Sequence, residues 1–218
     1  VGKIGDIVPP LYLIFGAGNV GRNAALMAHN MGARVIVFDT NELLVKKLNA
    51  EYTNLHDIVF LPYQNASLEN FLVEGDIFIG AAIPNINGLA AKVLKREDLK
   101  YIKPRSVLID VAIDQGGCFE SSVVTTHDNS TRVIEGIIHY GVTNIPALAA
   151  HTASLAMEKE HLQYLKQLSV LPVQDLVKHD NPIRSGICTY KGDLYNETVA
   201  DIWGMKAEMW PTNHKTNT

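Results

Sequence analysis

The chain has 218 residues, of which 47% are hydrophobic and 19% charged, and its formal net charge is −4 at pH 7. This composition is ordinary for a globular protein, and the length suffices for one large domain or for one domain and part of another. The sequence has no cluster of Lys and Arg, and none of its apolar runs approaches the roughly 20 residues that span a bilayer, so we expect neither nucleic acid nor a membrane as a partner.

The first 150 residues alternate between short apolar runs and longer amphipathic stretches. The predicted strands are Leu11–Phe15, Arg34–Asp39, Ile58–Leu61, Ile77–Ala82 and Ser106–Val111, with further short strands at Val133–Ile134 and Ile137–Val142. The predicted helices are Asn19–Met31, Asn41–Glu51, Ser67–Glu74 and Arg96–Tyr101. Strands that are apolar throughout, with helices between them, are typical of a parallel sheet covered on both faces. The predicted fold class is therefore α/β, with a Rossmann-like, doubly wound parallel sheet.

The pattern changes at about Thr152, where leucines begin to recur at helical spacing. Leu155, Leu162, Leu165 and Leu168 predict a long amphipathic helix, after which prolines interrupt a more polar end. We therefore expect two domains, a Rossmann domain over residues 1–150 and a C-terminal helix and tail over residues 151–218.

The two cysteines, Cys118 and Cys188, are too few and too far apart to form a disulfide framework or a zinc site. We therefore expect no metal site, and a reducing, cytoplasmic environment. The chain begins with Val1 rather than Met, which suggests a fragment or a processed chain.

A glycine-rich turn follows the first predicted strand and opens the first predicted helix. Its sequence is Gly16-Ala17-Gly18-Asn19-Val20-Gly21. In such a setting the first glycine permits a tight turn, the second lets the backbone approach a pyrophosphate, and the third lets the helix pack close to the sheet. The N–H groups and dipole of the helix N-terminus favour the anion. The residues predicted to bind a dinucleotide here are Gly16, Gly18, Asn19, Val20 and Gly21.

Asp39 ends the second predicted strand, 18 residues after Gly21. An acidic residue at this place accepts hydrogen bonds from the adenosine ribose and repels a 2′-phosphate, which favours NAD over NADP. The alternative is that Asp39 is a solvated carboxylate at the end of a strand.

A longer segment identifies a family. It reads Asp110-Val111-Ala112-Ile113-Asp114-Gln115-Gly116-Gly117-Cys118-Phe119-Glu120 and resembles a distinctive stretch of the alanine dehydrogenases. The related proton-pumping transhydrogenases are similar here but usually carry Glu in place of Asp114. The resemblance runs from about Ile4 to Met205 and continues at Thr125-Thr126-His127, His139-Tyr140, Asn144-Ile145-Pro146, Tyr190-Lys191-Gly192 and Asn196-Glu197.

The resemblance implies where NAD and the substrate lie. It places Ala82 and Ile83 near the ribose and, around the nicotinamide, Val111, Ala112, Ile113, Val142, Thr143, Asn144 and Ile145. It assigns Asp114 to the nicotinamide and substrate region as a catalytic carboxylate, which could orient the amine or the ribose and stabilise an iminium-like transition state. The alternative for Asp114 is a turn-capping role before Gly116. Cys118 is expected to be a small buried residue, and Asp110 is expected to face the sheet or a neighbouring helix end.

Several residues depart from the family pattern. Leu44 stands near the place of a basic residue that commonly follows the ribose-binding acid, and Val123 replaces an Arg. His151 stands close to another missing Arg and is either a partial substitute or a surface histidine at the start of a helix. These changes put cofactor affinity and substrate in question.

The resemblance implies an NAD-dependent alanine dehydrogenase, which converts L-alanine to pyruvate and ammonia and assembles as a homo-oligomer. In that family the substrate domain combines an N-terminal segment, which carries an Arg, a Lys and a His of the active site, with the C-terminal tail. We therefore expect residues 151–218 to be a remnant of an incomplete substrate domain, and we expect this chain alone to bind NAD and to turn over alanine poorly. The alternatives are the nucleotide-binding subunit of a transhydrogenase and a non-catalytic NAD-binding regulator.

Overall fold

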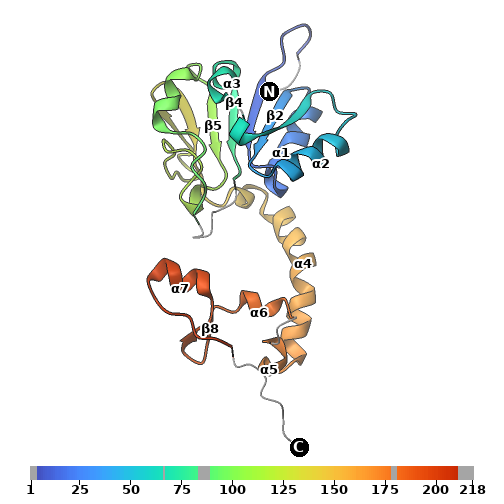
Figure 1. The fold of residues 1–218 in the computed structure, drawn as a ribbon, viewed down its shortest axis with the longest axis vertical. Helices are drawn as coiled ribbons and strands as arrows, with labels where there is room; N and C mark the ends of the chain where they lie inside the picture. The colour runs from blue at the N-terminus through green and yellow to red at the C-terminus, as the bar shows by residue number, and fades with distance from the viewer. Residues whose placement is uncertain (1–3, 66, 83–88, 178–180, 211–218) are drawn as a thin grey trace, which may run out of the picture. The chain divides into compact units, whose positions relative to one another are not determined.

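The computed structural model describes residues 4–65, 67–82, 89–177 and 181–210. These residues form two compact units, of which the first ends at Ile145 and the second begins at Pro146 (Figure 1). Each unit is described by itself below.

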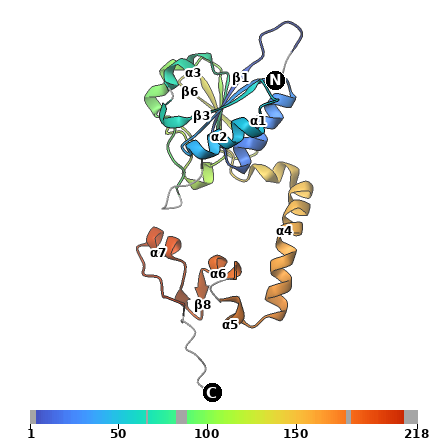
Figure 2. The same cartoon turned by 45° about the vertical axis from the view of Figure 1, so that its right-hand side comes forward.

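The first unit is built on a seven-stranded sheet with the order β3-β2-β1-β4-β5-β7-β6. Its strands are β1 (Leu11–Phe15), β2 (Arg34–Asp39), β3 (Ile58–Pro62), β4 (Ile77–Gly80), β5 (Val107–Asp110), β6 (Thr131–Ile134) and β7 (Ile137–Tyr140). From β1 the chain adds β2 and β3 on one side and then returns to add β4 and β5 on the other, all of them parallel. The Rossmann-like, doubly wound α/β fold is therefore confirmed. In Figure 2 the strands fan out as in a twisted sheet.

The sheet is not parallel throughout, because β6 pairs antiparallel with β7 at one edge. Only Glu135 and Gly136 connect these two strands, and both have positive φ angles, of 52° and 81°. Two successive residues of positive φ are typical of the tight turn of a β-hairpin, whereas a parallel pair needs a crossover of a dozen or more residues. The expectation of a wholly parallel sheet is wrong at this edge.

Helices cover both faces of the sheet. They are α1 (Asn19–Asn30), α2 (Glu42–Glu51) and α3 (Leu68–Glu74), with 3₁₀ segments η1 (Tyr63–Asn65), η2 (Arg96–Tyr101) and η3 (Ile113–Gln115). A fourth 3₁₀ segment, η4 (Ile145–Ala149), begins at the last residue of the first unit and continues into the second. Alternate side chains of β1 point to opposite faces. On one face Tyr12 and Ile14 belong to the core cluster that includes the buried residues of α1 and α2. On the other face Leu13 and Phe15 belong to the cluster that includes Leu72 of α3.

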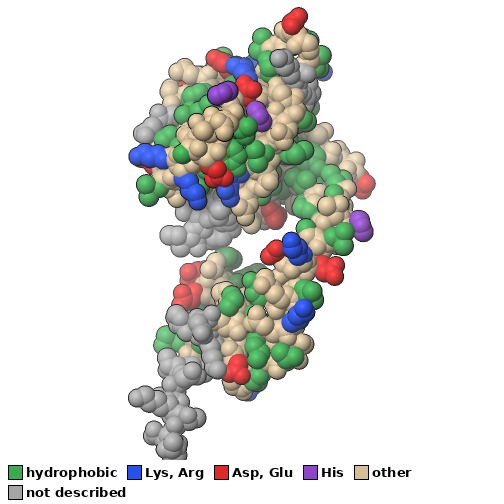
Figure 3. Space-filling view, turned by 90° about the vertical axis from the view of Figure 1, so that its right-hand side faces the viewer, with side chains coloured by type: hydrophobic (Ala, Val, Ile, Leu, Met, Phe, Trp, Pro, Cys, Tyr) green, Lys and Arg blue, Asp and Glu red, His purple; other side chains and the backbone are tan. Residues whose placement is uncertain are grey.

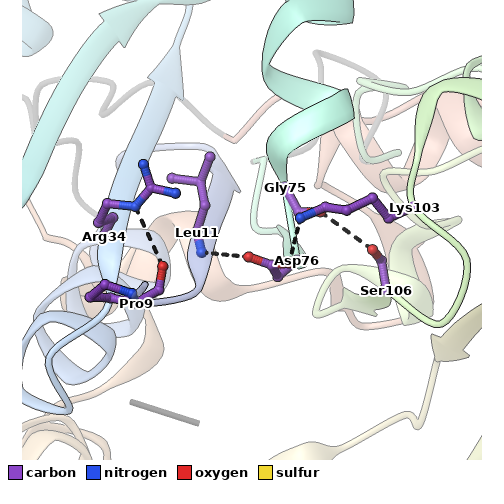
Figure 4. A network of polar contacts seen from close by, with 7 residues as sticks. All are labelled: Pro9, Leu11, Arg34, Gly75, Asp76, Lys103 and Ser106. Atoms are coloured by element: carbon purple, nitrogen blue, oxygen red, sulfur yellow. Dashed lines mark hydrogen bonds and ion pairs between the residues drawn. The ribbon is translucent and has the colours of Figure 1, made fainter. Parts of the chain in front are cut away.

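Polar contacts lie where β1, β2, β4 and β5 begin (Figure 4). The carboxylate of Asp76, just before β4, accepts hydrogen bonds from the backbone N–H of Leu11 at 2.8 Å and from the ammonium of Lys103 at 2.6 Å. Partial burial opposes ionisation of Asp76, but these two donors outweigh it and lower the pKa of the carboxyl group. These contacts hold the amino-terminal ends of the strands together, at the opposite end of the strands from their carboxyl ends.

The second unit contains α4 (Ala150–Val170), α5 (Val173–Leu176), α6 (Ile183–Gly186), β8 (Thr189–Tyr190), β9 (Asp193–Leu194) and α7 (Glu197–Trp203). The long helix that the leucine spacing predicts is present as α4, but none of its residues is buried. Its leucines are 45–58% exposed, and Figure 3 shows charged and apolar side chains mixed on the surface of this unit. Within the described residues, no helix has the length and apolar character needed to cross a membrane.

Candidate functional site

The carboxyl ends of the parallel strands meet at one edge of the sheet, and the strand order reverses there between β1 and β4. In open α/β sheets this reversal leaves a crevice in which ligands bind. Three predicted binding residues lie at the carboxyl ends of strands. Gly16 follows β1, Asp39 is the last residue of β2, and Ala82 lies two residues beyond β4. The topology therefore brings together residues that are far apart in the sequence.

The glycine turn needs glycine at two positions for steric reasons. Gly16 has a φ angle of 106°, and a Cβ atom on it would overlap the carbonyl oxygen of Ala81 after β4. A Cβ atom on Gly21 would overlap the carbonyl oxygen of Gly16, because α1 packs directly against the turn. The two glycines thus allow the end of β1, the end of β4 and the first turn of α1 to approach one another closely.

The N-terminus of α1 has no side-chain cap. Gly18 occupies the N-cap position, and the first turn has no acidic residue. The side-chain oxygen of Asn19 accepts a hydrogen bond from Arg22 at 2.9 Å. The first N–H groups of a helix have no partner within the helix, so an uncapped, non-acidic first turn is suited to an anion.

Asp39 is half-buried and organises the glycine turn. One carboxylate oxygen accepts the backbone N–H of Ala17 at 2.7 Å, and the other accepts the backbone N–H of Asn41 at 2.8 Å. Asn41 in turn caps α2 through its side chain. Both oxygens of Asp39 thus accept backbone N–H groups, and each still has a second acceptor position for a ligand hydroxyl.

A cavity of about 510 Å³ lies against these residues. A volume of this size is typical of pockets for small molecules and cofactors. Its lining is Phe15, Gly16, Gly18, Phe38, Asp39, Thr40, Asn41, Leu44, Tyr63, Ala81, Ala82, Ala91, Lys92 and Val93. Four of the predicted cofactor residues, Gly16, Gly18, Asp39 and Ala82, are among them. The apolar members form walls, and Asp39 provides a negative charge.

Several lining residues are not predicted from the sequence. Tyr63 lies on η1 after β3, and its hydroxyl donates a hydrogen bond to the carbonyl of Val93 at 2.8 Å. Burial, and then the negative charge of Asp98, raise the pKa of the Tyr63 hydroxyl, so it remains a donor at neutral pH. Tyr63 follows a strand directly, and that place in the chain is the only signal for it in the sequence.

The loop after β5 is organised by Asp110. Its carboxylate is buried and accepts the backbone N–H groups of Cys118 at 2.8 Å and Phe119 at 3.2 Å, as well as the hydroxyl of Ser122 at 2.5 Å. The prediction that Asp110 faces the sheet or a helix end is therefore wrong, because the loop folds back over the end of its own strand.

The same loop carries Cys118 and Asp114. Cys118 is fully buried, as predicted, and desolvation by burial raises the pKa of its thiol to about 11. Asp114 lies on η3 with an exposed side chain. Val111 is half-buried, and Ala112 and Ile113 are buried. None of these four residues is part of the lining of the 510 Å³ cavity.

The segment after β7 emerges next to this loop, because β5 and β7 are neighbouring parallel strands. Val142 is buried, whereas Thr143 and Asn144 are exposed and Ile145 is half-buried. These four residues, like Asn19, Val20 and Gly21, do not line the cavity. Ile83 lies outside the described residues.

The departures from the family pattern lie in different places. Leu44 contributes an apolar side chain to the cavity wall, Val123 is 40% exposed, and His151 is exposed on α4 in the second unit. Across the part of the chain that the structure describes, no three His, Cys, Asp or Glu side chains are grouped so that they could hold a metal ion.

Comparison with known sequences gives a family and several relatives. The model of the family described as "Alanine dehydrogenase/PNT, C-terminal domain" matches residues 1–197. The alanine dehydrogenase of Halomonas elongata is 36% identical over 92% of this chain and 53% of its own length. Alanine dehydrogenase 2 of Staphylococcus aureus is 36% identical over 88% of this chain and 51% of its own length. The chain thus spans about half the length of the curated relatives it matches.

Solved structures agree with this result. An L-alanine dehydrogenase superposes with a TM-score of 0.81 and 28% identity, over 93% of this chain and 55% of that one. A transhydrogenase from Sinorhizobium meliloti superposes with a TM-score of 0.63 over 74% of this chain and 45% of that one, and its 23% identity supports the fold alone. The chain belongs to the alanine dehydrogenase/PNT C-terminal-domain family.

Proposed function

We propose that the first unit binds NAD at the edge of the sheet where the strand order reverses. The cavity of about 510 Å³ beside the uncapped N-terminus of α1 is the observation on which this proposal rests. Gly18, Asn19, Val20 and Gly21 would hold the pyrophosphate at the N-terminus of α1, and Gly16, whose own N–H donates to the carbonyl of Phe38, would form the tight turn of the binding site. Asp39 would accept the hydroxyls of the adenosine ribose. The carboxylate also disfavours the 2′-phosphate of NADP.

The nicotinamide half is assigned to the loops after β5 and β7. In this proposal Ala82 and Ile83 lie near the ribose, and the ring lies among Val111, Ala112, Ile113, Val142, Thr143, Asn144 and Ile145. Apolar walls there exclude water from the reacting carbon. Asp114 is the catalytic carboxylate that we assign to this region, where it would orient the reacting amine and stabilise developing positive charge.

The reaction that we propose is the oxidative deamination of L-alanine to pyruvate and ammonia. Bound NAD would accept the hydride that leaves the alanine Cα, with water supplying the oxygen of pyruvate. Two relatives at 36% identity carry the name alanine dehydrogenase, which favours this substrate. Asp114 and the ending Cys118-Phe119-Glu120 argue against the transhydrogenase alternative.

Calorimetric titration and a turnover assay test this proposal together. We expect the 218-residue chain to bind NADH more tightly than NADPH, and we expect Asp39→Asn to weaken NADH binding by about tenfold, because it removes the charge from hydrogen bonds to the ligand. The exposed Asp57 lies before β3 at the opposite edge, so Asp57→Asn is the matched control. Absence of NADH binding by the unaltered chain would exclude the cofactor assignment.

The turnover assay measures NADH formed from NAD and L-alanine. We expect a very low rate from these 218 residues, because they span about half the length of the relatives. A robust rate would contradict the expectation that further groups are needed. Binding of NADH without any binding of alanine or pyruvate would instead favour the non-catalytic regulator. Hydride exchange between NADH and an NADP analogue, in the presence of partner subunits, would favour the transhydrogenase.

The remaining assignments follow from this function. We propose that residues 1–150 act as the NAD-binding domain and that residues 151–218 belong to the substrate domain. We also propose a homo-oligomer in the cytoplasm, a location with which the two free cysteines, Cys118 and Cys188, agree.

A further inference from the structure

The segment before η2 runs alongside the loop after β5, and backbone hydrogen bonds join the two. The N–H of Ala90 donates to the carbonyl of Gln115, and the N–H of Val93 donates to the carbonyl of Cys118, both at 2.8 Å. Between these two bonds lie the carbonyls of Gly116 and Gly117. The ladder of backbone donors therefore skips two consecutive acceptors.

One side chain fills this gap. The ammonium group of Lys92 donates to the carbonyl of Gly116 at 2.5 Å and to that of Gly117 at 2.7 Å. Gly116 and Gly117 have φ angles of 89° and 76°, so the backbone turns there in a left-handed conformation that does not continue an extended ladder. An ammonium group has three donors on a flexible stem, which lets it satisfy two carbonyls that backbone N–H groups do not reach.

Lys92 also lines the 510 Å³ cavity, between Ala91 and Val93. Asp114 precedes Gly116 by two residues, on η3. Lys92 thus joins a wall of the cavity to the turn that follows the proposed catalytic carboxylate. Among the residues that the structure describes, no other Lys or Arg is part of the lining of this cavity.

We propose that Lys92 is a positioning residue that fixes the Gly116–Gly117 turn and thereby the place of Asp114 relative to the nicotinamide half of the cofactor. This inference rests on the proposed function, since it assigns Asp114 to that half. Two of the three donors of the ammonium group are committed to carbonyls, so its main role is to hold the turn. A direct contact with the adenosine or pyrophosphate half is the competing role, and it makes a different prediction.

Binding of NADH and of ADP-ribose, which lacks the nicotinamide ring, separates these roles. We expect Lys92→Met to weaken NADH binding about fivefold in calorimetric titration and to change ADP-ribose binding by less than about twofold. Lys92→Arg keeps a positive charge and enough N–H donors for both carbonyls, and it should restore NADH binding. Lys95→Met is the matched control, because Lys95 is exposed and its ion pair with Glu97 spans 3.8 Å.

Asp114→Asn extends the test to the residue through which Lys92 is proposed to act. We expect the loss of NADH affinity in the double variant with Lys92→Met to be clearly smaller than the sum of the two single losses, since both act at one place. Additive losses, equal losses for NADH and ADP-ribose, or unchanged NADH binding in Lys92→Met would each overturn the proposal.

Amide hydrogen exchange of the cofactor-free chain tests whether Lys92 holds the Gly116–Gly117 turn. We expect faster exchange at Gly116–Phe119 in Lys92→Met than in the unaltered chain or in Lys95→Met. Unchanged exchange there would show that the hydrogen bonds of Lys92 do not hold the turn. If the unaltered chain binds neither nucleotide, the NAD assignment fails and the positioning role fails with it. The exchange result then still shows whether Lys92 holds the turn.

Discussion

At the scale of single residues, the polar side chains buried in the first unit have specific partners. His139 on β7 is buried, and its Nε2 atom lies 2.8 Å from the hydroxyl oxygen of the buried Ser121, while its Nδ1 atom lies 3.2 Å from the carbonyl oxygen of Ile137. The carbonyl can only accept, so Nδ1 carries a proton, and in the neutral imidazole Nε2 accepts the hydrogen bond of the Ser121 hydroxyl. Burial lowers the pKa of His139 below its ordinary value of 6.5.

This pair makes stability depend on pH. The unfolded chain takes up a proton at His139 near pH 6.5, whereas the folded chain does so only at a lower pH. In the interval between these values the unfolded state binds more protons, so the free energy of unfolding decreases as the pH falls. We expect His139→Gln to flatten this dependence between pH 7.5 and pH 5 in urea titrations. His127→Gln, at an exposed histidine, should keep the slope of the unaltered chain. Equal slopes for all three proteins would contradict the assignment.

Site residues that belong to one local sequence motif could be predicted. Residues that reach the site only because the fold brings distant segments together could not. The glycine turn and Asp39 are recognisable because their spacing along the chain reflects one strand–turn–helix unit. Tyr63, Lys92 and Val93 reach the same cavity from segments that only the packing of the sheet brings close. The prediction for Asp110 differs from the structure for the same reason, because its hydrogen-bond donors are backbone amides of a loop that folds back over the end of the strand.

At the scale of elements, the approach of α1 to the sheet depends on Gly21. A Cβ atom there would overlap the carbonyl oxygen of Gly16 and come within 3.4 Å of the side chain of Ile14. Since backbone atoms cannot move aside cheaply, α1 would have to shift away from the turn. The position of this helix, and with it the direction of its first N–H groups, is therefore set by the absence of a side chain.

Gly21→Ala should lower the free energy of unfolding by about 1–3 kcal/mol, because the added methyl group overpacks a rigid contact. Urea denaturation measures this loss. Gly186→Ala in α6 is the control, since a Cβ atom there meets nothing within 4 Å and alanine favours a helix. A neutral effect of Gly21→Ala would show that α1 can move without cost.

The strands were predicted correctly where a continuous apolar run determines their bounds. β1 and β2 have the bounds that their apolar runs predict. The antiparallel direction of β6 was missed, because Glu135-Gly136 is a turn that depends on positive φ at a glutamate, a residue that is uncommon in that conformation. The exposure of the α4 leucines was missed as well, since periodicity predicts an apolar face and does not say what covers it.

At the scale of the whole molecule, the residues that line the cavity and the residues of the second unit come from different parts of the chain. All the described residues that line the cavity precede Ile145, where the first unit ends. The core clusters of this unit are likewise formed by residues between Leu11 and Ile137. The first unit therefore has its own core and contains the lining of the cavity.

A chain that ends at Ile145 should fold and bind NADH with an affinity within about threefold of the 218-residue chain, since no part of the lining is removed. Circular dichroism verifies folding, and calorimetric titration gives the affinity. Loss of NADH binding by a folded shortened chain would show that the second unit contributes to the site.

The two cysteines differ in a way that has a practical consequence. A thiol reacts as its thiolate, and the buried Cys118, with a pKa of about 11, is almost entirely protonated at neutral pH. Cys188 is exposed, between α6 and β8. A maleimide fluorophore at pH 7 would therefore label Cys188 and spare Cys118. The unaltered sequence thus carries an optical reporter position on the second unit, outside the lining of the cavity.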